Sequence, residues 1–260
     1  PHKVPRPQPN MAFHGGIHRN ADPIYEFPDT RIVKHMVEGL PLRVSALRSL
    51  GAYANIFALE SFMDELAEEL GRDPLTFRLA HLRNPRARAV LNAAATAANW
   101  RQAPRKEGHG QGLAFARYKN QKCLAAVIID LSVEDDGHIQ LLKAVIAADA
   151  GQIVDPRGLR SQLEGGLIQS ASWTLKEQVS FDGGGITSRD WESYPILRFN
   201  NIPKIETVLM DRSGEPFLGA GEASSGPTGG AIINAIYNAI GLRLRRMPFN
   251  PDAIRSAAMN

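Results

Sequence analysis

The sequence predicts an α+β fold in which antiparallel β hairpins pack against helices, and three signals along the chain support this assignment. Helical periodicity dominates residues 55–100, two β-rich runs flank a turn at 135–137, and an apolar helix precedes Gly241. Helices interspersed with hairpins are typical of an α+β domain, whereas a doubly wound sheet requires a regular alternation of strands and helices.

The composition of the chain argues against several classes of protein function. The 260 residues are 43% hydrophobic, which is enough for one large domain or two ordinary ones. The formal charge is +3, and no long run of Lys or Arg favours nucleic acid or an anionic membrane. No apolar stretch approaches the ~20 residues of a membrane span. The single Cys123 cannot hold an iron–sulfur cluster alone, and the histidines form no HExxH zinc motif.

The first part of the chain divides into an arm and a helical region. Residues 1–23 are rich in Pro, Gly and His and predict an extended N-terminal arm that lies on another part of the protein. Residues 24–105 predict a mainly helical region, in which each helix has a local start or stop signal. Its three helices run from about Asn55 to Gly71, from Asp73-Pro74 to about Leu82, and from Asn84-Pro85 to about Trp100.

Residues 106–260 predict an α+β C-terminal domain. Its expected elements are a buried antiparallel hairpin over 123–151, a helix from Pro156 to about 178, a short hairpin around 181–185, a strand near 205–210, and a terminal helix. Gly165 and Gly166 stand in the middle of the first of these helices and cost it roughly 2 kcal/mol of helix propensity. Close approach of another backbone or a ligand is the expected compensation.

The terminal helix is expected after Gly226-Pro227-Thr228, with Thr228 as its cap and Gly241 as its stop. Its first N–H groups and positive dipole end would face the loop that carries Glu222 and could bind an anion. That loop, GAGEASSGPTGG, has no large side chain to cover the acid and offers many amides for close approach to a ligand.

Glu222 has three interpretations from its neighbours alone: an ordinary surface carboxylate, a general acid or base, or a cation ligand. Gln162, Glu164 and Gln169 share a helix with the glycine pair, and a buried glutamine there could hydrogen-bond the edge of a heterocycle. Arg48 stands at a loop-to-helix junction, where a surface salt bridge is the ordinary alternative. No GxGxxG, Walker or GxSxG motif occurs.

Four stretches together carry a family resemblance. They are LRSLGAYANIFALESFMDELAEELGRDPLTFRLAHL, VIAADAGQIVDPRGLRSQLEGGLIQS, SYPILRF and FLGAGEASSGPTGGAIINAIYNAIGLRLRRMP, in this order over residues 24–255. They resemble the molybdopterin-binding large subunit of the xanthine dehydrogenase and aldehyde oxidase group, and most closely its bacterial branch with isoquinoline 1-oxidoreductase. Their joint occurrence is more specific than any one stretch.

The resemblance assigns roles to residues of this sequence. It implies that Glu222, in the Gly-x-Gly-Glu loop, is the catalytic base, with Glu215 of the Gly-Glu-Pro triplet as a competing match. It implies that Leu50 lines the substrate pocket and that no residue here ligates the metal directly. The residues that it places at the cofactor are Gln162, Arg48, Ser49, Gly51, Gly219 and Gly221.

The resemblance also implies the reaction, which is hydroxylation with water as the oxygen source. Glu222 would take the proton of a Mo–OH group, and hydride would pass to a Mo=S sulfur. The implied cofactor is molybdenum–molybdopterin in its cytosine dinucleotide form. Relatives that oxidise purines have an aromatic residue where this chain has Ser49 and Leu50, which favours an aldehyde or an N-heterocycle as substrate.

Further parts of the complex are expected from the same resemblance. The upstream half of the molybdopterin subunit, with its Gly-Gln-Gly loop, is absent from this sequence and is expected either as a separate chain or as a truncated segment. Iron–sulfur clusters are expected on a 2Fe-2S partner subunit, with an FAD or cytochrome subunit as a further partner. A bacterial cytoplasm or periplasm is the expected location, and the sequence does not choose between them.

Two other readings of the chain remain open. In the first, it is a non-catalytic assembly or scaffold portion of such a complex. In the second, it is a metal-independent hydrolase that uses Glu222 with a histidine.

Overall fold

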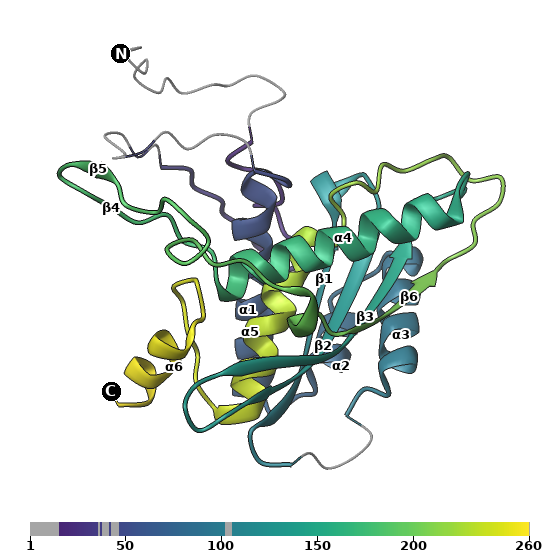
Figure 1. Ribbon diagram of the computed structural model, residues 1–260. Coiled ribbons are helices and arrows are strands. Elements are labelled where there is room, and N and C mark those ends of the chain that lie inside the picture. Colours follow the sequence, from purple (N-terminus) through teal and green to yellow (C-terminus); the bar gives the residue numbers. More distant parts are fainter. Residues whose placement is uncertain (1–15, 36, 38–41, 43–46, 102–105, 260) are drawn as a thin grey trace.

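A four-stranded mixed sheet forms the centre of the protein in the computed structural model (Figure 1). The strand order is β1 (His109–Arg117), β2 (Leu124–Val133), β3 (Ile139–Asp149) and β6 (Lys204–Leu209). The first three strands pair antiparallel, and β6 pairs parallel to β3. The structure describes residues 16–35, 37, 42, 47–101 and 106–259.

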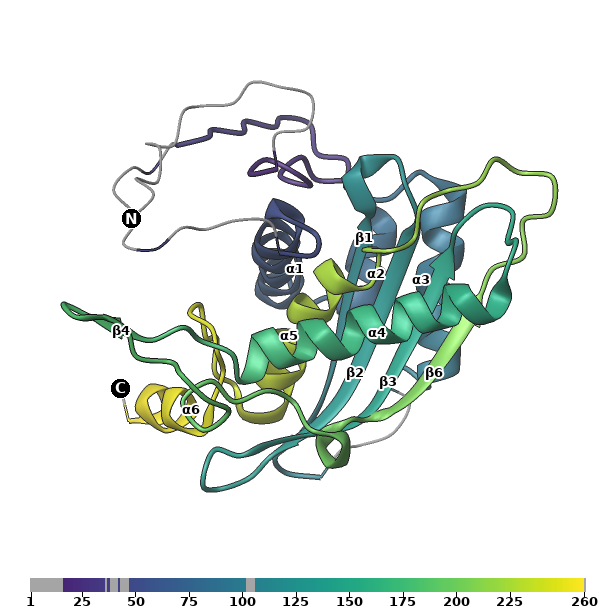
Figure 2. The ribbon, with the colours of Figure 1, turned by 45° about the horizontal axis from the view of Figure 1, so that its top comes forward.

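Helices cover both faces of this sheet, so the fold is α+β as the sequence predicts. On one face lie α2 (Pro74–Ala80) and α3 (Pro85–Ala98), and on the other α4 (Pro156–Leu175) runs across the strands (Figure 2). The buried α5 (Ser225–Ile240) packs on β1 and β2 and also touches α1 (Gly51–Glu69). None of the helices in the described residues is long and apolar enough to cross a membrane.

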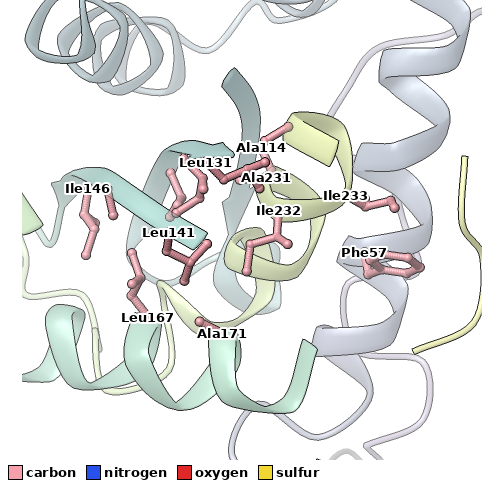
Figure 3. Close-up of a cluster of buried hydrophobic side chains, with 14 of the residues drawn as sticks. Phe57, Ala114, Leu131, Leu141, Ile146, Leu167, Ala171, Ala231, Ile232 and Ile233 are labelled. Carbon is pink, nitrogen blue, oxygen red and sulfur yellow. The ribbon is translucent and has the colours of Figure 1, made fainter. Parts of the chain in front are cut away.

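Alternate residues of the buried strands point into two hydrophobic cores. Val127 and Ile129 of β2 face α4 and α5, whereas Ala126 and Ile128 face α3, as the two-residue period of a strand requires. Figure 3 shows the first core, where Leu167 of α4 and Ile232 of α5 meet the sheet. The second core combines residues of 24–105 with β1–β3, so the two predicted parts share buried packing.

The local helix signals are confirmed. The side chain of Asp73 accepts a hydrogen bond from the Thr76 backbone N–H at the start of α2, and that of Asn84 accepts from two N–H groups of α3. The hairpin of β2 and β3 turns at Asp135–Gly137, and the short β4 (Phe181–Asp182) pairs with β5 (Gly185–Ile186). Two elements begin earlier than expected: α1 starts at Gly51 and α5 at Ser225.

The predicted cap of α5 is wrong. The N-cap residue is Ser224, which makes no side-chain capping bond, and Thr228 lies inside the first turn with its hydroxyl donating 2.7 Å to the Ser224 carbonyl. Pro227 does not interrupt this turn, because the first four N–H groups of a helix have no intrahelical partner. Gly241 ends the helix in the left-handed conformation, at a φ of 72°, as expected.

Strand β1 has no counterpart among the predicted elements. Its sequence, HGQGLAFAR, contains two glycines that weaken a strand signal. The structure explains them, because a Cβ on Gly110 would lie 2.0 Å from the Ala235 carbonyl oxygen, and one on Gly112 would lie 2.1 Å from that of Ala231. The glycines therefore allow α5 to lie directly on the strand. The remaining unpredicted elements are α6 (Pro251–Ala258) and two 3-10 helices, Tyr118–Asn120 and Phe199–Asn201.

Candidate functional site

Glu222 lies where three segments meet: the loop before α5, the loop before α1, and the 3-10 helix after β1. One carboxylate oxygen, Oε1, accepts a hydrogen bond of 2.7 Å from the backbone N–H of Ser49. The other, Oε2, accepts one of 2.5 Å from the hydroxyl of Tyr118. The side chain is half-buried. Glu222 is therefore a fixed carboxylate, held by two neutral donors.

Arg48 joins the same loop to helix α4. Its guanidinium donates to the carbonyl of Gly221 (2.7 Å from Nε) and to both the carbonyl and the side-chain oxygen of Gln162 (3.0 and 3.1 Å). Nη1 also approaches Oε1 of Gln169 at 3.4 Å. The surface salt bridge considered for Arg48 is absent among the described residues, since these partners are neutral oxygens. The structure thus brings together Arg48, Gln162 and the Glu222 loop, which the sequence singled out separately.

The backbone around Glu222 adopts unusual conformations. In the described residues, seven non-glycine residues have positive φ, and five of them surround this site: Asn20, Ser49, Leu50, Lys119 and Asn120. Ordinary residues reach this region at a cost of roughly 1–3 kcal/mol, and such residues cluster at functional sites. Gly51 follows directly, and a Cβ there would lie 2.4 Å from the Gly16 carbonyl oxygen. Packing therefore holds the loop in a backbone conformation that the local residue preferences alone would not favour.

Helices α4 and α5 approach each other closely beside the loop. A Cβ on Gly166 would lie 2.4 Å from Oγ of Ser224, whereas one on Gly165 would meet nothing within 4 Å. The close approach predicted for the glycine pair is therefore confirmed at Gly166, and Gly165 leaves open space. Within the described part of the chain, the buried Oγ of Ser225 has no hydrogen-bond partner.

The face of the site towards solvent is polar and open. Gln162, Gln169, Gly219 and Gly221 are exposed, and a Cβ on Gly221 would have the Gln162 side-chain oxygen as its nearest neighbour, at 3.8 Å. Amide side chains beside bare backbone suit the edge of a heteroatom-rich ring. This donor set fits a pterin cofactor.

Glu215 lies in a different cluster. Its side chain is 53% exposed and stands 3.7 Å from Arg86. Arg86 is also bonded to the buried Asp149, together with Arg212. No histidine in the described part of the chain hydrogen-bonds Glu222, so the geometry offers no support for the histidine-assisted hydrolase.

Sequence reasoning missed Tyr118, Arg19 and Asn20. Tyr118 is 5% exposed and contacts Glu222, and Nη1 of Arg19 donates 2.7 Å to its hydroxyl. Asn20 is 7% exposed and donates 2.8 Å to the Arg117 carbonyl. The sequence offers only a weak indication of these residues: Tyr118 stands between two basic residues, directly after a strand that was not predicted. The arm predicted for 1–23 is described from Gly16 onward, and this part does lie on the protein.

Comparison with known proteins agrees with this picture. Two family models, each described as a molybdopterin cofactor-binding domain, match residues 7–82 and 63–203. The chain is 39% identical over 254 residues to a subunit of nicotinate dehydrogenase from Pseudomonas putida, covering 92% of this chain and 21% of that protein. It is 31% identical over 211 residues to the beta chain of isoquinoline 1-oxidoreductase from Brevundimonas diminuta, covering 80% of this chain and 27% of that protein.

Solved structures share the fold at low sequence identity. Quinoline 2-oxidoreductase from Pseudomonas putida 86 matches 83% of this chain and 53% of its own with a TM-score of 0.72 and 12% identity. Aldehyde oxidoreductase from Desulfovibrio gigas matches 83% of this chain and 42% of its own, with a TM-score of 0.69 and 16% identity. The chain spans about a quarter of the curated relatives named above. It belongs to the molybdopterin cofactor-binding domains of the xanthine dehydrogenase and aldehyde oxidoreductase family.

Proposed function

We propose that this chain supplies the catalytic base and one wall of the cofactor site of a molybdenum hydroxylase, which oxidises an aldehyde or an N-heterocycle with water as the oxygen source. The observation that carries the proposal is the fixed carboxylate of Glu222, which directly follows the exposed Gly221. The carbonyl of Gly221 accepts from Arg48, which also binds Gln162. A positioned carboxylate beside a ligand-accessible backbone is the arrangement that general base catalysis requires.

The residues of this chain divide the work between binding and proton transfer. When bound, the molybdenum cofactor supplies the redox chemistry. Gln162, Gly219 and Gly221 would hold the pterin, and Arg48 would keep the Glu222 loop against α4. Leu50, which has a positive φ, and Gly51, the first residue of α1, would shape the substrate side. The carboxylate of Glu222 would accept a proton from the oxygen nucleophile, because both of its oxygens retain an unshared electron pair.

The complete enzyme would need more than this chain. We infer that the remainder of the molybdopterin-binding subunit, on the same or a separate polypeptide, completes the site, since the chain spans 21% and 27% of two relatives. A 2Fe-2S subunit would take the electrons, with an FAD or cytochrome subunit after it, and the cofactor would be the cytosine dinucleotide form. The names of the relatives make nicotinate, isoquinoline and aldehydes the first substrates to test.

The test begins with the enzyme purified together with its partners from the native host. Molybdenum, iron and pterin nucleotide are measured per chain, and turnover is compared between wild type, Glu222→Gln and the control Glu215→Gln. We expect near-stoichiometric molybdenum in all three. Turnover should fall about 10²- to 10⁴-fold in E222Q alone, the usual contribution of a general base.

Two results would refute the proposal. Full turnover by E222Q would remove Glu222 as the base. A purified complex without molybdenum would favour the scaffold role instead.

A further inference from the structure

The hydroxyl of Tyr118 has no freedom in where its hydrogen points. A tyrosine hydroxyl has one hydrogen to donate, and Arg is a donor that cannot accept. Nη1 of Arg19 lies 2.7 Å from the Tyr118 oxygen and therefore occupies an acceptor position. The one hydrogen is left for Oε2 of Glu222, at 2.5 Å. Arg19 thus orients the hydroxyl towards the carboxylate.

The segment Gly16–Asn20 is anchored on both sides of this contact. The side-chain amide of Asn55, on α1, donates 2.9 Å to the carbonyl of Ile17 and 2.9 Å to that of Arg19. On the other side, the Asn20 side chain accepts from the Lys119 N–H and donates to Asn120. The segment is therefore built into the site, and it carries Arg19 with it.

Burial and the negative charge of Glu222 favour a Tyr118 that stays protonated, and they outweigh the opposing effect of Arg19. Burial and the neighbouring Glu222 raise the pKa of Tyr118 well above its usual value. The other groups facing this pair are Arg19, Lys119, whose Nζ is 5.7 Å from the Tyr118 ring, and Arg48 at the Gly221 carbonyl. At neutral pH the phenol is therefore protonated and donates its hydrogen bond.

We propose that Tyr118 is a positioning residue for Glu222, and that Arg19 of the segment Gly16–Asn20 orients the Tyr118 hydroxyl. Together with the Ser49 N–H, the hydroxyl holds the carboxylate in one orientation. The proposal rests on the proposed role of Glu222 as the base. It goes beyond that role by assigning a task to the N-terminal segment.

The first test compares Tyr118→Phe with Tyr194→Phe in the assembled enzyme. Tyr194 is a matched control, because its hydroxyl also donates to a glutamate, Glu177, at 2.7 Å, between the two segments that flank the β4–β5 hairpin. Loss of the hydroxyl in Y118F removes one of the two donors that orient the Glu222 carboxylate. kcat should fall roughly 10-fold or more with little change in KM, and Y194F should behave as wild type.

The second test needs no turnover. The ultraviolet resonance Raman difference spectrum, wild type minus Y118F, isolates the Tyr118 doublet, whose intensity ratio reports hydrogen-bond donation by the hydroxyl. We expect that ratio to indicate strong donation in wild type, and weaker donation in E222Q and in Arg19→Met. The same spectra decide the case if Y118F fails to bind molybdenum.

The outcomes separate the two proposals. If E222Q abolishes turnover while Y118F keeps the wild-type kcat and the Raman ratio is insensitive to E222Q, the positioning role is wrong and the base survives. If E222Q retains full turnover, the base itself is wrong. An unchanged Raman ratio in Arg19→Met would overturn the part assigned to Arg19.

Discussion

Glu60 and Glu222 each accept hydrogen bonds from one tyrosine hydroxyl and one backbone N–H, yet the two carboxylates differ in burial and in ion pairing. Glu60 accepts 2.8 Å from the Tyr25 hydroxyl and 2.8 Å from the Phe115 N–H, as Glu222 accepts from Tyr118 and Ser49. Glu60 is fully buried and also paired with Arg78 at 3.0 Å. Glu222 is half-buried and has no ion pair among the described residues.

The same pair of donors, a tyrosine hydroxyl and a backbone N–H, therefore occurs in two different settings. At Glu60 the carboxylate is enclosed by packing and also accepts from Arg78, so it links α1 to β1 and α2. At Glu222 the two donors fix the orientation of the carboxylate, and no cation pairs with it among the described residues. This is the difference expected between a structural acid and the base that we propose.

The largest effect is expected from breaking the ion pair on one side of this comparison. Arg78→Leu would leave Glu60 charged and unpaired in the core, which should lower the unfolding free energy by about 3–5 kcal/mol. The control Arg48→Leu removes bonds to neutral oxygens on the Glu222 side and should cost about 1 kcal/mol. Chemical denaturation of both variants measures the two values, and equal losses would contradict the distinction.

Replacing each glutamate by glutamine should separate stability from turnover. Glu60→Gln weakens contacts with Arg78 and Phe115 in a buried site and should lower the unfolding free energy by about 1–3 kcal/mol. Glu222→Gln should change it by less than about 1 kcal/mol, because water reaches this site. Thermal unfolding of the two variants tests this contrast, and a large destabilisation by E222Q would make Glu222 structural.

Added methyl groups should distinguish closed from open packing. A Cβ on Gly230 would lie 2.9 Å from that of Glu60 and 3.2 Å from that of Ala114, so Gly230→Ala should cost about 1–3 kcal/mol by overpacking. Gly221→Ala, beside Glu222, has no such close neighbour and should stay within about 0.5 kcal/mol. Denaturant midpoints compare the pair, and a stable Gly230→Ala would show that the Glu60 side is not tightly packed.

The smallest expected effect is a loss of stability in alkali. Burial and Glu60 raise the pKa of Tyr25, and burial and Glu222 raise that of Tyr118. A raised folded pKa gives stability that is present below the unfolded value near 10 and is lost as pH rises through the folded value. Y25F and Y118F should each flatten this loss above about pH 10, as unfolding midpoints against pH would reveal. Unchanged slopes would contradict the shifts.

Local signals account for the parts of the fold that were foreseen. The caps of α2 and α3, the turn between β2 and β3, and the stop of α5 at Gly241 each depend on a few consecutive residues. Strand β1 was missed because its glycines serve contact with α5 and dilute the strand pattern. The parallel pairing of β6 with β3 was missed because its partner is remote in sequence.

The candidate site likewise has features that local sequence patterns predict and features that depend on contacts between distant residues. The glycine-flanked Glu222, the glycine pair of α4 and Arg48 have local patterns, so the sequence alone was enough to select these residues as candidates and to determine the family. Their meeting was decided only by the tertiary structure, since Ser49 and Glu222 are 173 positions apart, Tyr118 and Glu222 are 104, and Arg19 and Tyr118 are 99. Short-range preferences specify helices, caps and turns, whereas contacts between distant residues form only when the whole core has packed.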